Sequence, residues 1–331
     1  MSKVGVAIFG LNGHQIHSLL THHPKAELVA AGACSREQLP AELPTRASIP
    51  IYDTLEGVLN HEQVDLVSLC SPRRADQAGH AVQCLEQGRH VYAEKPCATT
   101  EADLDAILTA ADRSGAVFHE MASTAFEQPY FSMRRLVQSG TIGEVVQILA
   151  QKSYPYHARR PQDEAVDGGL ICQNGVHALR LIEHVSGLQA TEITALETGL
   201  GNRESGGLMM ACTMIMPMEN GALATAIANY LNSNAFGSWG NETLRIFGTR
   251  GFVETVDGGS RTRLCLENED LGPFDAGDPG WDWFGGVLDD VLGMGKMPIP
   301  LEEEVHPTRM VLRAKAAARV PPAAGPLTPA T

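Results

Sequence analysis

Residues 64–96 read "VDLVSLCSPRRADQAGHAVQCLEQGRHVYAEKP" and contain two apolar runs with a helical pattern between them. The first run stops at Ser71-Pro72, and the second leads up to Lys95. The intervening residues 75–90 predict a helix. A strand, a helix and a second strand in this order are typical of a βαβ unit, whose two strands are parallel. The stretch therefore predicts a parallel sheet, with Lys95 at the carboxyl end of one strand.

The same alternation continues on both sides of this stretch. Thr100 followed by Asp103 suits the start of one helix, and Gly115 suits its end. Right-handed crossovers place such helices on both faces of a doubly wound sheet. We therefore expect residues 1–122 to form a Rossmann domain that binds ligands at the carboxyl ends of its strands. The further predicted strands are residues 4–9, 26–34 and 116–121, and the further predicted helices are residues 13–22 and 100–115.

The pattern changes after Ala122. A predicted helix over residues 129–139 is followed by strand candidates that lie close together, several of them joined by short turns. Short connections favour antiparallel neighbours. Residues 123–331 are therefore expected to form an α+β domain with a mainly antiparallel sheet. The strand candidates are residues 144–154, 190–198, 208–217, 221–231, 241–256 and 261–268.

Charge and cysteine usage exclude several classes of partner. The 331 residues carry a net charge of −14, and the 25 Lys and Arg residues form no basic run. Nucleic acid and anionic membranes both attract clustered cations, so neither is expected as a partner. The seven cysteines are scattered without a C-x-x-C pair, which favours reduced thiols in the cytoplasm. No apolar stretch approaches the roughly 18 residues that a membrane span needs.

A degenerate glycine-rich loop follows the first predicted strand. Residues 10–15, "GLNGHQ", match the dinucleotide fingerprint G-x-G-x-x-G at Gly10, whereas Asn12 and Gln15 replace the other two glycines. Gly13 and His14 could adjust the turn so that the backbone still approaches a pyrophosphate. An ordinary strand-to-helix turn remains the alternative. The nearby histidines have no acid or cysteine at ligand spacing, so no metal site is expected.

The second predicted strand ends at Ser35 and Arg36. An NAD-specific domain usually places an acidic residue there for the ribose 2′-hydroxyl. A hydroxyl and a guanidinium instead suit a 2′-phosphate, because arginine binds phosphate through a fork of two donors. This favours NADP over NAD. A surface arginine is the alternative, and Glu37 could still bind ribose.

Residues 167–187, "DGGLICQNGVHALRLIEHVSG", predict an amphipathic helix that carries candidate catalytic groups. Gln173 and His177 are four residues apart and are expected on one face. Gly175 lies between them, which suggests a close approach to the helix backbone. His177 could donate and accept a proton near neutral pH. Lys95 could stabilise a developing alkoxide. A structural histidine and a structural ion pair are the alternatives.

Substrate contacts are expected from residues 153–161, "SYPYHARRP", just before this helix. Aromatic rings, an imidazole and a guanidinium suit the recognition of a polyol or an acid. A solvated loop is the alternative. The expected substrate residues are Tyr154, Tyr156, His157, Arg160 and, inside the helix, Asn174.

Lys95 in Glu-Lys-Pro, together with "GG-x-x-x-x-x-G-x-H" at residues 168–177, resembles the glucose-fructose oxidoreductase/inositol dehydrogenase/MocA family. The resemblance covers most of the chain. It includes "LVQSGTIGEV" at 136–145, "LRIFGTRGFVE" at 244–254 and "WDWFGGVLDDVLGMGKMP" at 281–298.

The resemblance implies a Rossmann domain followed by a domain with a large open sheet. It also implies NAD(P)-dependent oxidation or reduction, usually of sugars or polyols, and assembly into a dimer or tetramer. On that basis Lys95 and His177 flank the reacting carbon. In the reducing direction, His177 or a water it holds delivers a proton while Lys95 steadies the oxygen. The cofactor contacts that the family segment implies are Ser71, Pro72, Arg73, Glu94 and Lys95.

The chain departs from the family pattern at several positions. Gln173 stands where the family usually has Asp, four residues before the histidine, and a neutral amide cannot stabilise a cation. Arg180 replaces a second Asp, and "ASTAF" at 122–126 replaces Asn-Arg. Lys95, His177 and Gln173 are nevertheless the expected catalytic residues of an NAD(P)-dependent dehydrogenase or reductase. A nucleotide-binding sensor with little turnover and an NAD-dependent glycosidase are the alternatives.

Overall fold

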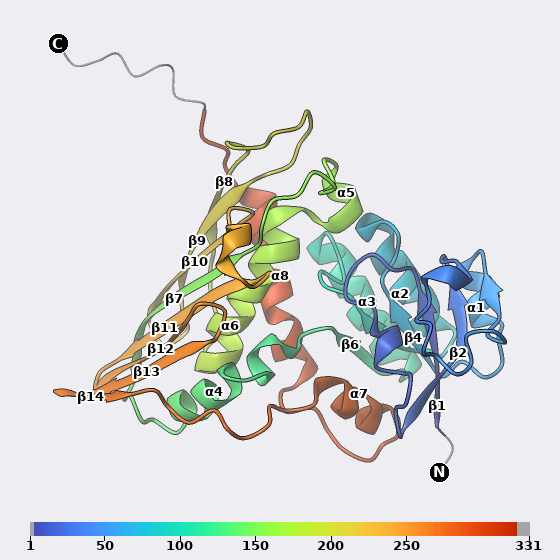
Figure 1. Ribbon diagram of the computed structural model, residues 1–331, viewed down its shortest axis with the longest axis horizontal. Coiled ribbons are helices and arrows are strands. Elements are labelled where there is room, and N and C mark those ends of the chain that lie inside the picture. Colours follow the sequence, from blue (N-terminus) through green and yellow to red (C-terminus); the bar gives the residue numbers. More distant parts are fainter. Residues whose placement is uncertain (1–2, 323–331) are drawn as a thin grey trace.

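Six parallel strands form the first sheet, in the order β3-β2-β1-β4-β5-β6 (Figure 1). The computed structural model describes residues 3–322. The chain moves outward from β1 in both directions, so the loops after β1 and β4 meet at the switch point where dinucleotides bind. This order confirms the predicted doubly wound sheet. The strands are β1 (Val4–Phe9), β2 (Ala26–Gly32), β3 (Ile51–Tyr52), β4 (Leu66–Leu69), β5 (His90–Ala93) and β6 (Phe118–Glu120).

Helix α3 begins and ends where the sequence signals predict, α2 is shorter than the predicted residues 75–90, and α1 was not predicted. The Thr100 side chain accepts a hydrogen bond from the Asp103 amide at the start of α3, and Gly115 ends that helix with φ +67°. Every residue of β1 and β4 is buried, as expected for strands covered on both faces. The helices are α1 (Leu55–Leu59), α2 (Gln77–Glu86) and α3 (Glu101–Ser114).

The helix predicted over residues 13–22 is wrong. Only a single 3₁₀ turn forms there, at Ile16–Ser18. The Gln15 side chain accepts from the Ile16 amide and donates to the carbonyl oxygens of Gly10 and Ser68, which fixes the chain after β1. The following serine, threonine and histidines are weak helix formers that do not extend this turn.

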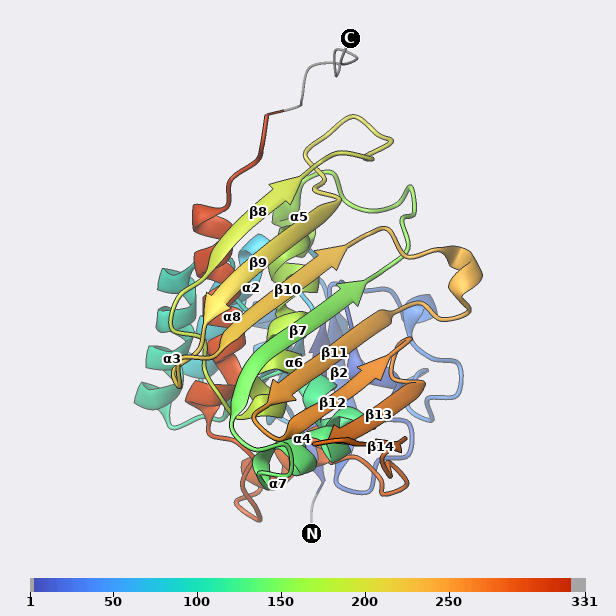
Figure 2. The same cartoon turned by 90° about the vertical axis from the view of Figure 1, so that its left-hand side faces the viewer.

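The second sheet has eight strands in the order β14-β13-β12-β11-β7-β10-β9-β8. All neighbours are antiparallel except β7 and β10, which confirms the mainly antiparallel prediction. One face of this sheet lies open toward the viewer in Figure 2. The strands are β7 (Val145–Ser153), β8 (Thr194–Thr198), β9 (Ala211–Pro217), β10 (Leu223–Asn229), β11 (Asn241–Gly248), β12 (Gly251–Val256), β13 (Arg261–Leu266) and β14 (Glu269–Gly272).

Helices cover the other face of the second sheet and separate it from the first (Figure 1). Helix α6 is buried along its whole length because it packs against β7 on one side and against α4 and α8 on the other. Among residues 3–322, no helix has both the length and the apolar character needed to cross a bilayer. The helices are α4 (Tyr130–Gln138), α5 (Glu164–Asp167), α6 (Val176–Ser186), α7 (Trp283–Val291) and α8 (Leu301–Ala317).

Candidate active site

The loops after β1, β4 and β5 meet at the carboxyl edge of the first sheet. The Asn12 amide donates to the carbonyl oxygen of Cys70 at 3.1 Å. The His14 amide donates to the Glu94 carboxylate at 2.6 Å, and the His14 ring lies 3.1 Å from the same group. The structure therefore brings together the predicted cofactor residues that follow these three strands.

Two glycines permit this close approach. Gly10 has φ +74°, and a Cβ there would lie 2.2 Å from the Cys70 carbonyl oxygen. Gly13 has φ +127°, and a Cβ there would lie 2.6 Å from the Glu94 carboxyl carbon. Both positions are therefore restricted to glycine. Among the described residues, the amides of Leu11 and Gln15 have no hydrogen-bond partner, so the loop retains donors for a phosphate.

A segment before α6 rests on this loop. The Asn12 side chain donates to the carbonyl oxygens of Pro72 at 3.2 Å and Val166 at 2.6 Å. The buried Arg74, which the sequence analysis did not select, donates to the Asn12 carbonyl oxygen at 2.7 Å. Asn12 thus connects the glycine-rich loop, the Ser-Pro turn and the second part of the chain. Ser71 is buried against His80, whereas Arg73 is exposed near Asp163.

Ser35 and Arg36 follow β2, one strand away from this cluster. The Arg36 guanidinium donates to the backbone carbonyl oxygens of Arg46 and Ile49. Ser35 is exposed, and its amide donates to the Gln38 side chain. To bind a 2′-phosphate, the Arg36 guanidinium would have to share or give up its hydrogen bonds to these two carbonyl oxygens.

Lys95 is only 1% exposed. Its ammonium donates to the Gln173 carbonyl oxygen at 2.6 Å and lies 3.9 Å from the Glu94 carboxylate. Burial lowers the pKa of Lys95 to about 8, although the Glu94 charge opposes that shift. Burial also disfavours the Glu94 carboxylate, but the His14 hydrogen bond and the Lys95 ammonium outweigh it and lower the Glu94 pKa to about 2. Lys95 is therefore a buried acid whose pKa is close to neutral.

His177 lies in the first turn of α6. Its Nδ1 is 3.1 Å from the Thr124 hydroxyl, and its buried Nε2 has no partner among the described residues. Burial, followed by the ammonium groups of Lys95 and Lys152, lowers the pKa of His177 well below its usual value. The imidazole is therefore neutral, with one nitrogen available to a ligand.

The residues before His177 form a π-helix, Ile171–Gly175, rather than the predicted α-helix. The Gln173 side chain accepts from the Tyr230 hydroxyl at 3.2 Å, and no hydrogen bond joins it to His177 among the described residues. The close approach predicted at Gly175 comes from Met214, whose Cε would lie 3.0 Å from an added Cβ. Single π-helical turns are frequent at functional sites.

The predicted substrate residues form a cluster of aromatic rings beside His177. The Tyr154 ring lies 6.4 Å from His177 and 6.1 Å from Trp239, and His157 lies 5.7 Å from Trp239. Asn174 donates to the Asn229 carbonyl oxygen at 3.1 Å. Thirteen buried side-chain polar atoms lack a partner in the described part of the chain, and five belong to predicted site residues: Tyr156, His157, Arg160, Asn174 and His177.

The sequence analysis missed Lys152 and Thr124. Lys152 continues the buried face of β7, after Ile148 and Ala150, so the alternation of that strand was an available signal. Its ammonium contacts the Glu242 carboxylate and lies 4.8 Å from the centre of the Tyr154 ring. Burial and then the Lys95 charge lower the pKa of Lys152 to about 7, whereas the Glu127 charge opposes this. Thr124 lies in "ASTAF", where the sequence offered no signal.

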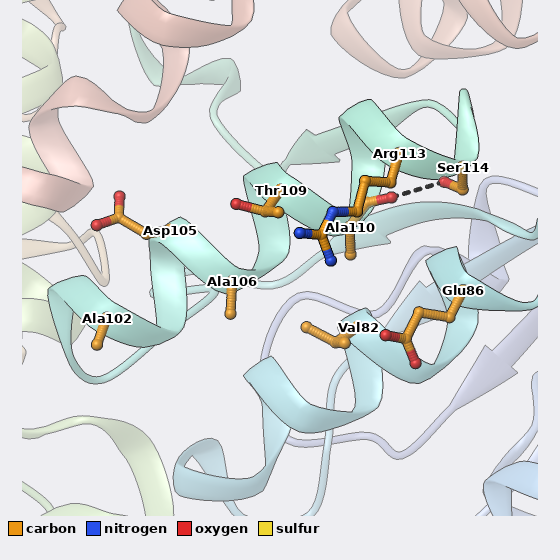
Figure 3. A pocket seen from close by; sticks show the side chains of 9 residues that line it. All are labelled: Val82, Glu86, Ala102, Asp105, Ala106, Thr109, Ala110, Arg113 and Ser114. Atoms are coloured by element: carbon orange, nitrogen blue, oxygen red, sulfur yellow. Dashed lines mark hydrogen bonds between the residues drawn. The ribbon is translucent and has the colours of Figure 1, made fainter.

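A hollow of about 510 Å³ lies between α2 and α3 and contains none of these residues (Figure 3). Its side chains come only from the two helices, including Val82 and Glu86 from α2 and Asp105 and Arg113 from α3. The candidate site is therefore a different region, at the carboxyl edge of the first sheet.

Comparisons with known proteins agree with both sheets. A family model described as an oxidoreductase family with an NAD-binding Rossmann fold matches residues 4–121, and the model of the GFO/IDH/MocA C-terminal domain matches residues 130–254. Trans-1,2-dihydrobenzene-1,2-diol dehydrogenase of Bos taurus is 24% identical over 80% of this chain and 77% of that protein.

Two bacterial relatives match over a smaller share of their length. One is 1-carboxy-3-chloro-3,4-dihydroxycyclohexa-1,5-diene dehydrogenase of Comamonas testosteroni, 26% identical over 66% of this chain and 56% of the relative. The other is scyllo-inositol 2-dehydrogenase (NADP(+)) IolW of Bacillus subtilis, 23% identical over 56% of this chain and 52% of the relative. The chain thus spans about half the length of these two relatives.

Solved structures share the fold over nearly the whole chain. The aldose-aldose oxidoreductase from Caulobacter crescentus complexed with glycerol has a TM-score of 0.77 at 18% identity, covering 96% of this chain and 97% of that one. The NAD-binding protein from Listeria innocua has a TM-score of 0.78 at 18% identity, covering 96% of each chain. The two family models together match more than half of the chain and establish that it belongs to the GFO/IDH/MocA oxidoreductase family.

Proposed function

We propose that the protein is an NAD(P)-dependent dehydrogenase or reductase that acts on a sugar, a polyol or a related carbonyl compound. One observation carries this proposal: Lys95 from the first sheet donates to the carbonyl of Gln173, and its charge acts on the nearby His177. An acid with a pKa near neutral and a free imidazole nitrogen in one buried site suit proton transfer at a hydroxyl group. The dihydrodiol and inositol dehydrogenases among the relatives support a hydroxyl-bearing substrate.

The residues of the first sheet fit a nicotinamide dinucleotide. Gly10, Asn12, Gly13, His14 and Gln15 would hold the pyrophosphate, because two of these positions exclude a Cβ and the loop has unpartnered amides. The Ser71–Arg73 turn and Glu94 would line the cofactor on the neighbouring strands. A bound nicotinamide would supply the hydride acceptor or donor.

The electrostatics favour Lys95 over His177 as the proton donor in the reducing direction. Lys95 has a pKa of about 8 and is mostly protonated at pH 7. His177 is neutral because burial and two ammonium groups disfavour its charged form. We therefore assign the proton to Lys95, while His177 orients the substrate oxygen through Nε2.

Hydride transfer is the direct test of this function. The protein is mixed with NADP(H) or NAD(H) and a panel of sugars and polyols, and nicotinamide absorbance is followed in both directions. Turnover that depends on a hydroxyl or carbonyl substrate is expected. Tight cofactor binding without turnover on any member of the panel would contradict an enzymatic role.

A pH profile separates the two proton carriers. For reduction, kcat/KM is expected to fall as the pH rises through about 8, because the Lys95 ammonium is lost. For oxidation, kcat/KM is expected to rise through the same range, because the neutral amine accepts the hydroxyl proton. The His177 pKa lies well below 6.5, so His177 is expected to add no ionisation to the profile between pH 7 and 10.

The Lys95→Arg variant is the control for this profile. Its guanidinium stays charged across the range. The kcat/KM of this variant should therefore stay constant as the pH passes through about 8, even if its overall activity is lower than that of the wild type. A wild-type profile that is flat in both directions would contradict the assignment to Lys95.

We further propose NADP as the preferred cofactor, with NAD as the alternative, because Ser35 and Arg36 follow β2. The Arg36→Ala variant is expected to weaken NADPH binding at least about tenfold, since a charged hydrogen bond is worth about 1.5–3 kcal/mol. NADH binding should change little, which makes NADH the internal control. Fluorescence titration measures both affinities. Equal losses for the two cofactors would indicate a structural role for Arg36 through its contacts to Arg46 and Ile49.

The other expectations remain proposals. We place the division between the domains near Ala122, in the gap between the two family-model matches. A dimer or tetramer through the open sheet is supported by the exposed apolar side chains of Val146, Ile215 and Leu223 on that sheet. The free thiols support a cytoplasmic location. The sensor and glycosidase alternatives are not favoured, because the relatives described above are dehydrogenases and oxidoreductases.

A further inference from the structure

Arg160 is a buried cation without an acidic partner. Only 7% of the residue is exposed, and its Nη2 donates a hydrogen bond to the Pro155 carbonyl oxygen at 3.1 Å. The buried Nε has no partner among residues 3–322, and no ion pair involves the guanidinium there. Burial lowers the pKa of Arg160, although the nearby Tyr230 and the more distant Asp167 charge oppose this. Arginine is rarely buried without a partner, because removing its charge from water is costly.

The two lysines of the site already have counter-ions, whereas Arg74 is bound to the glycine-rich loop. Lys95 lies near Glu94, and Lys152 contacts Glu242. Arg160 instead has no ion pair among the described residues, and the Asp167 charge acts on it only from beyond ion-pair distance. A chain with a net charge of −14 nonetheless keeps this cation beside its candidate catalytic groups. An anionic group on the ligand would complete the pairing.

Aromatic rings hold Arg160 in a fixed orientation. Its guanidinium carbon lies 3.6 Å from the centre of the Tyr230 ring and within 6 Å of the Tyr154 and Trp239 rings. Stacking of this kind stabilises the cation and leaves its in-plane N–H groups for a planar partner. The same tyrosines reach the catalytic groups, since the Tyr230 hydroxyl bonds Gln173 and the Tyr154 ring packs against His177.

A hollow of about 640 Å³ opens beside this cluster. It is lined by Tyr156 and Tyr230, by the amides of Asn202, Asn232 and Asn234 and by the cation of Arg203, and it adjoins Arg160 through Tyr230 rather than including it. Trp239 is exposed at the edge of the cluster, where a ring could stack on it. The surroundings thus suit a cyclic, hydroxyl-rich molecule.

We propose that the substrate is a cyclic sugar or polyol acid, whose carboxylate pairs with Arg160 while a hydroxyl on the same ring lies between Lys95 and His177. This inference rests on the proposed function and adds the charge of the substrate to it. A guanidinium binds a carboxylate through two parallel hydrogen bonds, which also fixes the orientation of the ring. Arg160 is thereby the residue that selects acids over neutral sugars.

Matched pairs of substrates test the proposal. The pairs are D-glucuronate with D-glucose and D-galacturonate with D-galactose, and D-glucose 6-phosphate serves as the phosphate-bearing comparison. Initial rates with the preferred cofactor give kcat/KM, and calorimetric titration with the same compounds gives binding without turnover. Wild-type protein is expected to prefer the acid of each pair at least about thirtyfold, because leaving a buried charge unpaired is costly.

Variants at position 160 and its neighbour provide the controls. Arg160→Met should abolish the preference for acids, because kcat/KM should fall much more for the acids than for the neutral sugars. Arg160→Lys keeps the charge and should retain part of the preference, which guards against misfolding of the methionine variant. Arg159→Met removes an exposed charge one residue away and should leave the preference intact.

Each result decides the proposal. Three outcomes would overturn the pairing with a carboxylate: equal kcat/KM for acids and neutral sugars, equal losses for both in Arg160→Met, or a preference for the phosphate. The proposed oxidoreductase function would stand in each case. If no compound is turned over, the proposed function fails, and the titration still decides the inference. Binding that requires the carboxylate and is lost in Arg160→Met would support the proposed pairing with Arg160. If the acids bound no better than the neutral sugars, that pairing would be overturned.

Discussion

Replacing Lys95 by alanine is expected to lower kcat at least about a hundredfold and to leave cofactor affinity within a factor of about three. A positioned general acid contributes about 10²–10⁴-fold to a rate, and loss of a cation that stabilises a developing alkoxide adds to this. Lys95 can act both as the acid and as the stabilising cation, because it is 1% exposed and has a pKa of about 8. Within residues 3–322 its ammonium contacts Glu94 and the Gln173 carbonyl, so the cofactor loop keeps its own hydrogen bonds.

The measurement is steady-state turnover with saturating cofactor, together with fluorescence titration of the cofactor. Lys95→Met is the matched variant, because it keeps the length and the apolar stem and removes only the charge. Both variants should lose kcat by a similar factor. If Lys95→Met kept more than about a tenth of the wild-type kcat, Lys95 would be a structural residue and the mechanism would require another acid.

Regular local patterns made much of the fold predictable from the sequence. The run of buried residues in β1 and the capping signals of α3 depend on neighbours in the sequence, so the sequence analysis found them. The helix predicted over residues 13–22 does not form, in part because the serine, threonine and histidines there are weak helix formers. Its outcome depends on Gln15, which bonds the Ser68 carbonyl on a different strand. A contact across 53 residues leaves no local pattern.

The same reasoning explains which site residues were found. Lys95 was selected because the carboxyl end of a parallel strand is a ligand position in any such sheet. Thr124 and Tyr230 could not be selected, because their roles depend on which side chains of α6 and the π-helix approach them. In the π-helical turn the Gln173 side chain accepts from the Tyr230 hydroxyl, and that contact has no signal in the local sequence.

Arg180 shows how a departure from the family pattern can be structural. Its guanidinium is fully buried and contacts the Glu120 carboxylate at 2.5 Å and the Met121 carbonyl at 2.7 Å. Glu120 also accepts from the Thr308 hydroxyl and from the Cys97 amide. These contacts join β6 of the first sheet, α6 of the second part and α8. Arg180 therefore connects the two halves of the molecule rather than taking part in proton transfer.

Arg180→Met is consequently expected to lower the free energy of unfolding by about 3–5 kcal/mol, because it leaves the Glu120 carboxylate buried and unpaired. Urea denaturation followed by circular dichroism measures the change. Arg135→Met is the matched control, since its partner Asp278 and Arg135 itself are exposed. An exposed pair contributes only about 0–1 kcal/mol, so this variant should stay close to wild type.

The double variant Glu120→Gln with Arg180→Met separates the cost of a stranded charge from the loss of packing. A neutral amide at position 120 still accepts from the Cys97 amide and carries no unpaired charge. We expect the double variant to recover at least half of the stability lost in Arg180→Met. Removing one member of a buried ion pair is costly mainly because the remaining charge is left buried and unpaired. If the double variant were no more stable than Arg180→Met, the guanidinium would act through its packing and its bond to Met121, and the charge of Glu120 would not be what holds the two halves together.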